Sequence, residues 1–242
     1  MSKRDVLFAP LSDNDELVFA VDNIGAIGEK ETDTIQVTYE MVAYYSLRVA
    51  MMEVLSVGGV PICVVVANFN DSNAWVQYET ALHQIREELH LGSIQLIGSS
   101  ETNFHLVQSA ASFTVVGTVK KATKRIGQTP MEAKLAVIGY PLVGQDVILR
   151  QHDIISLQQF NELLHYEGVY EILPIGSKGI QHELNVLHDL NEREKQVYSS
   201  SLPLHQSAGP ATCVLISYHE TCEQALSDSF QNRFYPLRSN GN

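Results

Sequence analysis

Residues 40–69 read EMVAYYSLRVAMMEVLSVGGVPICVVVANF, and this stretch decides the fold class. Its first part carries apolar or small residues one helical turn apart, which predicts a helix over residues 40–57. Gly58, Gly59 and Pro61 then end the helix, because glycine weakens a helix and proline cannot continue one. The run VPICVVVANF is apolar without alternation, which is typical of a strand covered on both faces. A helix followed directly by a buried strand indicates a mixed α/β domain.

The flanking segments continue this mixture of strands and helices. In the first half we expect strands at ELVFAVDN (16–23), TIQVTY (34–39), SIQLIG (93–98) and FTVVGTV (113–119), and a helix over residues 74–90. In the second half we expect strands at KLAVIGYPL (134–142), QDVIL (145–149) and ATCVLISY (211–218), and helices over residues 156–168, 180–196 and 220–230. Between them, KKATKRIGQTP (120–130) is a basic run with few apolar residues, either a domain junction or an exposed hairpin tip. We therefore predict two α+β domains, residues 1–122 and 123–242.

The composition narrows the class of partner and the compartment. A net charge of −12 argues against non-specific binding to nucleic acid or to anionic membranes, because the chain has no basic excess. The first residues lack the long apolar run of a signal peptide, and no segment is apolar over the length of a bilayer span. Three scattered cysteines form no disulfide framework or zinc motif. A soluble, cytoplasmic protein is the expectation, and an anionic small molecule would need a metal ion or a local cluster of backbone N–H groups to bind it.

Two acidic side chains stand where the surrounding pattern is apolar. Asp22 ends the first long strand, close to Gly25, and an ordinary turn would also explain it. Glu53 lies on the predicted helix among apolar or small neighbours, where an unpaired charge is costly. A salt bridge to a distant residue would satisfy Glu53, and so would a metal ion.

Two further segments join small residues to polar ones. In LIGSSETNF (96–104), Gly98, Ser99 and Ser100 allow close approach to the backbone, and Glu101 and Thr102 follow at once. In PIGSKGIQHEL (174–184), Ser177 and Lys178 stand between two glycines just before a predicted helix. Free N–H groups at a helix start can hold an anion, although Ser177 could equally be an ordinary N-cap.

Taken in order, these motifs resemble the aminoimidazole ribonucleotide (AIR) synthase superfamily, also called PurM-like, which includes thiamine-monophosphate kinase and selenophosphate synthetase. The motif around Asp22 and Gly25 is similar to the family's early acidic motif, RVAMMEVLSVGGVP to its helix that ends before a proline, and IGSSET to its Gly-Gly-Glu/Asp-Thr motif. PIGSKGIQHEL and GPATCVLISY are similar to the helix-opening motif and the last core strand of the second domain. The resemblance spans nearly the whole chain. Glu53 stands where the family has Asp, Ser99 and Ser100 replace glycines, and Ile175 replaces an acid.

The resemblance implies a two-domain protein that dimerises through its N-terminal strands and binds ATP with Mg²⁺. It also implies site residues. They are Asp22, Glu53 and Glu101 as metal ligands, and Gly25, Gly98, Ser99, Ser100, Thr102, Ser177 and Lys178 around the nucleotide. Carboxylate oxygens suit Mg²⁺, and phosphoryl transfer depends chiefly on positioning and on neutralisation of charge.

Three functions follow from the resemblance. The first is a small-molecule kinase, because the compact chain looks like the superfamily branch that acts as α-ribazole kinase in cobalamin salvage. The second is an ATP-dependent cyclo-ligase like AIR synthase. The third is a non-catalytic nucleotide-binding scaffold, which the loss of the acid at Ile175 would favour. No catalytic base can be assigned from the sequence.

Overall fold

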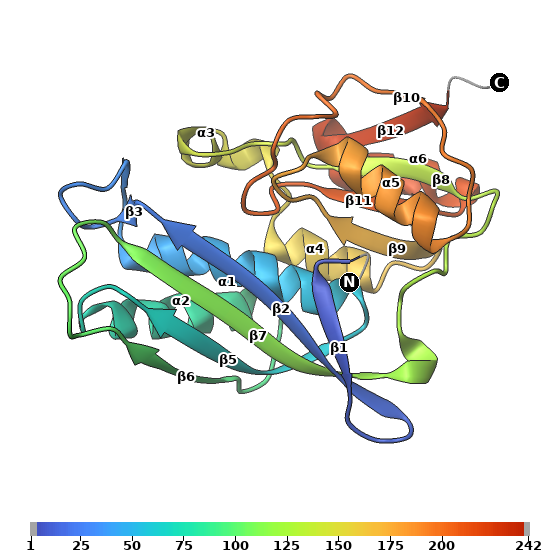
Figure 1. The fold of residues 1–242 in the computed structure, drawn as a ribbon. Helices are drawn as coiled ribbons and strands as arrows, with labels where there is room; N and C mark the ends of the chain where they lie inside the picture. Colours follow the sequence, from blue (N-terminus) through green and yellow to red (C-terminus); the bar gives the residue numbers. More distant parts are fainter. Residues whose placement is uncertain (1–3, 240–242) are drawn as a thin grey trace. The chain divides into compact units, whose positions relative to one another are not determined.

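The computed structural model of the protein describes residues 4–239 (Figure 1). The chain divides into an N-terminal unit of residues 4–124 and a C-terminal unit of residues 125–239. Each unit is a mixture of strands and helices, so the predicted mixed α/β class is confirmed.

The N-terminal unit contains a five-stranded sheet with the order β1-β2-β7-β5-β6. The parallel neighbours in it are β5 and β6, and the other pairs are antiparallel. The strands are β1 (Val6–Pro10), β2 (Asp15–Gly25), β5 (Val60–Asn68), β6 (Gln95–Ser100) and β7 (Ala110–Lys120), with a small separate pair formed by β3 (Ile27–Gly28) and β4 (Ile35–Gln36).

Two helices, α1 (Tyr39–Ser56) and α2 (Ala74–Glu88), pack together on one face of this sheet (Figure 1). Both helices were predicted, and so was the apolar strand β5. The predicted strand over residues 34–39 is wrong except for its two residues in β4. The reason is that Thr38 is the N-cap of α1 and accepts a hydrogen bond from the backbone N–H of Met41, which turns the chain into the helix.

The other face of the N-terminal sheet carries exposed apolar side chains, and we call it the open face. Successive residues of a strand point to opposite faces, so the residues beside those packed under the helices lie on this face. Its large apolar residues are 41% to 65% exposed. They are Leu7, Val21, Val60, Val65 and Ile97.

The C-terminal unit contains a second five-stranded sheet, which is antiparallel throughout, with the order β10-β12-β8-β11-β9. Its strands are β8 (Lys134–Ile138), β9 (Val169–Pro174), β10 (Tyr198–Ser199), β11 (Val214–Tyr218) and β12 (Phe234–Ser239). Its helices are α3 (Gln145–Leu149), α4 (Leu157–Leu164), α5 (Ile180–Leu190) and α6 (Glu223–Phe230). Short 3₁₀ turns occur at Lys121–Thr123, Gln151–Asp153, Glu220–Cys222 and Gln231–Arg233.

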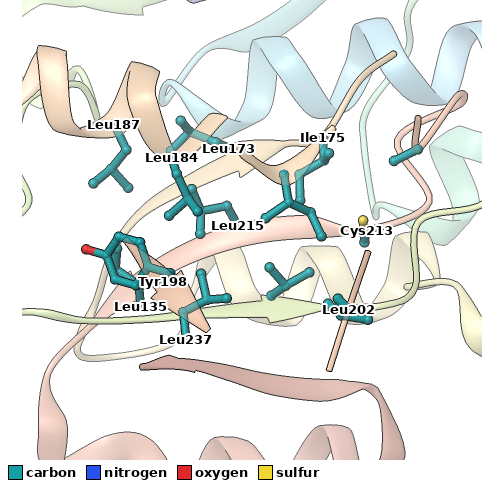
Figure 2. Close-up of a cluster of buried hydrophobic side chains, with 13 residues drawn as sticks. Leu135, Leu173, Ile175, Leu184, Leu187, Tyr198, Leu202, Cys213, Leu215 and Leu237 are labelled. Carbon is teal, nitrogen blue, oxygen red and sulfur yellow. The ribbon is translucent and has the colours of Figure 1, made fainter. Parts of the chain in front are cut away.

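A cluster of buried apolar side chains joins α5 to this sheet (Figure 2). Leu184 and Leu187 of α5 lie against Leu173 and Leu215 of the strands, and Tyr198 of β10 closes the cluster at one end. The interior strand β11, between β8 and β9, is buried along its whole length, which explains its continuous apolar sequence.

The segment QDVIL was predicted as a strand and is instead the short helix α3, so this prediction is wrong. Gly144 adopts a φ of 65° before it, a left-handed conformation that redirects the chain into the helix. A run of five residues is too short for its apolar spacing to distinguish a helix from a strand.

A buried carboxylate ties the start of the C-terminal unit to its sheet. Glu171 of β9 is fully buried and accepts hydrogen bonds from the backbone N–H of Gly127 at 2.9 Å and from the side-chain amide of Asn191 at 2.7 Å. It also accepts one from the hydroxyl of Thr129, which contacts Ser217. These donors compensate for the loss of hydration, and the connecting segment is thereby anchored.

Candidate functional site

Three strands of the N-terminal unit end at the same edge of the sheet. β2 ends at Gly25, which pairs with Ala110, the first residue of β7. β5 ends at Asn68, which pairs with Ala111 of β7 and with Ser100, the last residue of β6. The loops that follow β2, β5 and β6 therefore start from one edge, which we call the loop edge. Ligands of mixed sheets often bind where strands end and loops gather.

A network of polar side chains crosses the loop edge below these loops. The hydroxyl of Ser100 accepts hydrogen bonds from Asn68 Nδ2 and from Trp75 Nε1, both at 2.9 Å. Tyr78 donates its hydroxyl to Asn68 Oδ1 at 2.9 Å and accepts from Asn70 Nδ2 at 2.8 Å. Burial raises the pKa of Tyr78 to about 12, so it remains a neutral donor. Ser100 thus has a structural role at the loop edge, in addition to any contact with a ligand.

Gly98 lies two residues before Ser100, on the same face of β6 and beneath the ring of Trp75. A Cβ built at Gly98 would lie 2.0 Å from the backbone oxygen of Val66 and 2.7 Å from the tryptophan ring. Glycine is therefore required here for packing of the chain itself. At Gly25, by contrast, a Cβ would meet nothing within 4 Å, which leaves open space at that strand end. Ser99 points to the open face and is exposed.

A buried aspartate joins the segment between β3 and β4 to the loop after β6. Asp33 accepts hydrogen bonds from the backbone N–H of Ser109 at 2.7 Å, from the Ser109 hydroxyl at 2.6 Å and from the backbone N–H of Lys30 at 2.9 Å. Asp33 is 8% exposed, and its donors satisfy the carboxylate in place of water. Lys30 adds further contacts between the same segments through its ammonium group.

Asp22 lies on the helix-covered face of β2, three residues before the loop edge. Its carboxylate accepts a hydrogen bond from the Ser46 hydroxyl of α1. Burial raises the pKa of Asp22, while the hydrogen bonds from Ser46 and from the backbone of Asn23 act in the opposite direction. Asp22 is partly exposed, so a ligand at this face could reach it.

Glu53 is held by an arginine that the sequence alone did not connect to it. Arg4 Nη2 lies 3.6 Å from Glu53 Oε2, and both side chains are at most 9% exposed. Arg4 also donates to the Ser56 hydroxyl at 2.8 Å. Burial raises the pKa of Glu53 to about 7, although the Arg4 charge opposes this shift. The structure thus supports the salt-bridge alternative for Glu53.

Glu101 begins the loop after β6 and organises it. Its carboxylate accepts hydrogen bonds from the backbone N–H of Asn103 at 2.6 Å and of Phe104 at 3.3 Å, which closes a turn. Thr102 is exposed at the tip of this turn. Both residues lie at the loop edge, directly after the last residue of β6.

The structure does not bring the three predicted metal ligands together. Glu101 lies three strands away from Asp22, which is about 14 Å across the sheet. Glu53 lies two helical turns beyond Ser46, the partner of Asp22, or about 10 Å along α1. Among residues 4–239, no group of three or more His, Cys, Asp and Glu side chains is placed to hold a metal ion. Among the described residues, these three carboxylates therefore do not gather around one Mg²⁺ ion.

The predicted residues Ser177 and Lys178 lie in the C-terminal unit, in the turn between β9 and α5. Both are exposed. The N-cap of α5 is Gly179, with a φ of 79°, so the interpretation of Ser177 as an ordinary N-cap is wrong. The backbone N–H of Gln181 in the first turn donates to Leu204 O at 2.9 Å, which occupies one of the free donors of the helix start.

A surface hollow of about 490 Å³ opens at the opposite end of α2 from Trp75. It is lined by the last residues of the helix and by the turn after it: His83, Arg86, Glu87, His90 and Leu91. His83 and Glu87 lie 3.6 Å apart but are both well exposed, so their ion pair contributes little. The hollow is not part of the loop edge.

Three polar residues of the loop edge were not identified from the sequence. They are Asp33, Asn68 and Asn70. Lys30, the nearest candidate for the basic residue that follows the early glycines in the family, lies beside them. The asparagines could have been found, because Asn68 and Asn70 end an apolar strand and a polar residue at a strand end is a signal of a site or a turn. Nothing in the sequence near Asp33 indicates Ser109 as its partner.

Comparison of the sequence with family models and with curated proteins gave no match. Comparison of the structure with solved structures gave clear matches. The chain is similar to AaThiL complexed with AMPPCP and TMP, with a TM-score of 0.64 at 11% identity, over 100% of this chain and 86% of that one. It is similar to thiamine-monophosphate kinase from Stenotrophomonas maltophilia K279a, with a TM-score of 0.58 at 12% identity, over 96% and 88% of the two chains. PurLQS from Thermotoga maritima matches with a TM-score of 0.56 at 12% identity, over 98% of this chain and 37% of that one.

The chain therefore has the AIR synthase-like, or PurM-like, fold, and the resemblance read from its motifs is confirmed at the level of the fold. Of the helices within residues 4–239, none combines the length and the apolar character that crossing a bilayer requires.

Proposed function

We propose that this protein is an ATP-dependent phosphotransferase that acts on a small-molecule acceptor. The observation that carries the proposal is the fold, which extends over the whole of this chain in the match to AaThiL complexed with AMPPCP and TMP. The gathering of three loops with small residues at one sheet edge supports it, because phosphates need close approach to backbone N–H groups.

We assign the nucleotide to the loop edge of the N-terminal unit. Gly25 leaves open space at the end of β2, and Glu101 and Thr102 are accessible at the end of β6. Glu53 is left out of the site, because its carboxyl is buried beside Arg4. The phosphate contact of Ser177 and Lys178 stays a prediction from the resemblance, and within the C-terminal unit both are exposed polar residues in the turn before α5.

The residues present do not fit a Mg²⁺ ion held by three carboxylates of this chain. Mg²⁺ is often bound by one or two carboxylates together with substrate phosphates, so we propose that it arrives with the nucleotide. Asp22 and Glu101 are the two candidates for a single carboxylate contact, and each has partners that fix its position. Asp22→Asn and Glu101→Gln distinguish the two candidates. Nucleotide binding should lose its dependence on magnesium in the variant that removes the ligand.

The test of the proposal begins with binding of ATP and of AMPPCP in the presence of magnesium. Trp75 is the single tryptophan of the chain and donates to Ser100 at the loop edge, so its fluorescence reports a ligand there. We expect saturable binding that is weakened in Glu101→Gln and unchanged in Glu79→Gln, an exposed acid of α2. Absence of binding by the wild-type protein would refute the nucleotide site.

ADP release in the presence of candidate acceptors then identifies the reaction. We propose a nucleoside-like or vitamin-precursor acceptor, with α-ribazole as the first compound to test beside thiamine monophosphate. ADP formed only when one acceptor is added supports a kinase. Nucleotide binding without turnover on any acceptor would favour the non-catalytic scaffold, a reading that the buried Ile175 in place of an acid also supports.

We also propose that two copies of the chain associate through the open face. An exposed sheet face with five large apolar residues is typical of a surface that is covered in the assembled protein. The occupant that we propose is a second copy, in line with the dimerisation through the N-terminal strands that the resemblance to the family implies. Sedimentation should give a dimer for the wild type and a monomer for Val65→Asp, while Val76→Asp, which changes a residue 69% exposed on α2, should remain a dimer. A monomeric wild type would refute this proposal.

A further inference from the structure

The ammonium group of Lys30 is surrounded by backbone carbonyl oxygens of other loops. Lys30 Nζ lies 3.1 Å from Phe69 O, 2.9 Å from Leu106 O and 3.3 Å from Gln108 O. An ammonium has three N–H donors and no acceptor, so these three hydrogen bonds use its whole capacity. We call Phe69 O, Leu106 O and Gln108 O the carbonyl triad.

The carbonyl triad has the chemistry of a cation site. Backbone carbonyl oxygens are hard, neutral ligands, and several of them around one charge replace the hydration of a bare cation. Their dipoles point toward a common centre, so they repel one another unless a positive charge occupies that centre. In this protein the charge is supplied from within the chain, by Lys30.

The contacts of Lys30 join three segments near the loop edge. Lys30 lies between β3 and β4, Phe69 follows β5, and Leu106 and Gln108 belong to the loop after β6. Within the described chain, residues 101–109 belong to no helix or strand. Backbone hydrogen bonds hold the two ends of this loop, from Glu101 N to Asn68 O and from Ala26 N to Ser109 O, both at 2.8 Å. Between these ends, the Lys30 ammonium contacts Leu106 O and Gln108 O and also Phe69 O, so it joins all three segments.

Neutral hydrogen bonds accompany the ammonium between two of these segments. The Thr32 hydroxyl donates to Val107 O, and Gln108 Nε2 donates to Thr32 O at 2.8 Å. Hydrogen bonds to a charged group are stronger than neutral ones, so the loss of the ammonium should loosen residues 101–109 more than the loss of any one neutral contact. Lys30 is thus placed to act through the loops, as a positioning residue.

We propose that the carbonyl triad is a monovalent-cation site built into the fold, which Lys30 fills with its own ammonium and which binds a small alkylammonium ion when that side chain is removed. This fixes the loop after β6 at the candidate site. The proposal concerns the contacts of Lys30 alone, so it stands or fails independently of the phosphotransferase proposal.

The test is hydrogen exchange of the backbone amides of residues 102–109 in Lys30→Ala, with and without propylammonium chloride. Propylammonium has the size of the atoms that the substitution removes. We expect exchange to accelerate by roughly tenfold or more in Lys30→Ala, since a charge-assisted contact of the loop is lost. Propylammonium should restore the wild-type rate, and tetramethylammonium, which has no N–H donor, should not.

Two further variants make the result specific. Lys30→Met removes the charge but fills the space of the side chain, so its exchange should be fast and should not respond to propylammonium. Lys121 is a matched control, because its ammonium donates to Ser12 O at 3.3 Å and to Asp13 O at 3.0 Å in the turn between β1 and β2. Lys121→Ala should leave exchange of residues 102–109 unchanged.

Two results would overturn the proposal. One is exchange in Lys30→Ala that equals the wild-type rate at residues 102–109. The other is an equal response to propylammonium in Lys30→Ala, Lys30→Met and Lys121→Ala, which would be a general effect of the salt. If Lys30→Ala does not fold alone, we expect it to refold in propylammonium chloride and not in tetramethylammonium chloride, and failure in both would also overturn the proposal.

Discussion

Replacing Glu53 by glutamine should flatten the pH dependence of the stability of the N-terminal unit. The Glu53 side chain is 9% exposed, and burial raises its pKa from the ordinary value of 4.5 to about 7 against the opposing charge of Arg4. The folded state therefore holds the proton more tightly than the unfolded chain does. The contribution of Glu53 to stability is largest at low pH and is lost as pH rises from 4.5 to about 7.

The size of the effect follows from the pKa shift. A shift from 4.5 to about 7 corresponds to at most roughly 3 kcal/mol of unfolding free energy. Glutamine has nearly the shape of the protonated acid and carries no charge at any pH. We therefore expect Glu53→Gln to match the wild type near the lower end of this pH range and to be more stable than the wild type by up to this amount at about pH 8.

Urea unfolding followed by the fluorescence of Trp75 measures this difference, because the single tryptophan lies in the same unit as Glu53. Glu79→Gln, at an exposed site on α2, is the control and should keep the wild-type pH dependence. A smaller slope of the same sign should remain in Glu53→Gln, because burial also raises the pKa of Asp22. A variant that is less stable than the wild type at about pH 8 would refute the reasoning, since the Arg4 ion pair would then outweigh the cost of burial.

Three other predictions concern a close contact, a buried network and a buried histidine. Gly98→Ala should destabilise the N-terminal unit by roughly 1–3 kcal/mol in urea unfolding, because its Cβ would lie 2.0 Å from the carbonyl oxygen of Val66. Gly92→Ala is the control and should not change the stability, because a Cβ there would meet nothing within 4 Å. Glu171→Gln should destabilise the C-terminal unit by about 2–4 kcal/mol, because the new amide NH₂ would face N–H donors. Hydrogen exchange of β9 measures this loss of stability. An effect no larger than that of Glu162→Gln, at an exposed site, would contradict the prediction. Burial lowers the pKa of His188 from 6.5, so the stability of the C-terminal unit should fall as the pH drops below that value. Hydrogen exchange of α5 should show this pH dependence in the wild type and lose it in His188→Gln. An unchanged pH dependence in the variant would show that His188 is not its source.

The contacts between distant segments explain why the candidate site was only partly predictable. Gly25, Ser100 and Glu101 were found from sequence because strand ends carry small and polar residues, and the sheet order does bring them to one edge. The sequence alone could not show whether Asp22, Glu53 and Glu101 lie close together in the folded protein. This depends on the strand order and on the length of α1, which separate the three carboxylates by about 10–14 Å.

The sequence by itself determined those helices and strands whose apolar pattern is long enough to fit one kind of secondary structure only. Helices α1, α2 and α5 and the strands β2, β5 and β11 belong to this class, because burial of a face imposes a period over many residues. The order of the motifs along the chain was also enough to indicate the fold that the solved structures share.

Only the tertiary structure decided which polar groups meet. Arg4 lies far from Glu53 in the sequence, and Lys30 is still farther from Leu106, yet each pair is in contact. A charged residue among apolar neighbours in the sequence indicates that it needs a partner. The identity of the partner depends on how strands and helices pack, because this packing brings distant parts of the chain together. That packing is a property of the whole unit, which no local pattern contains.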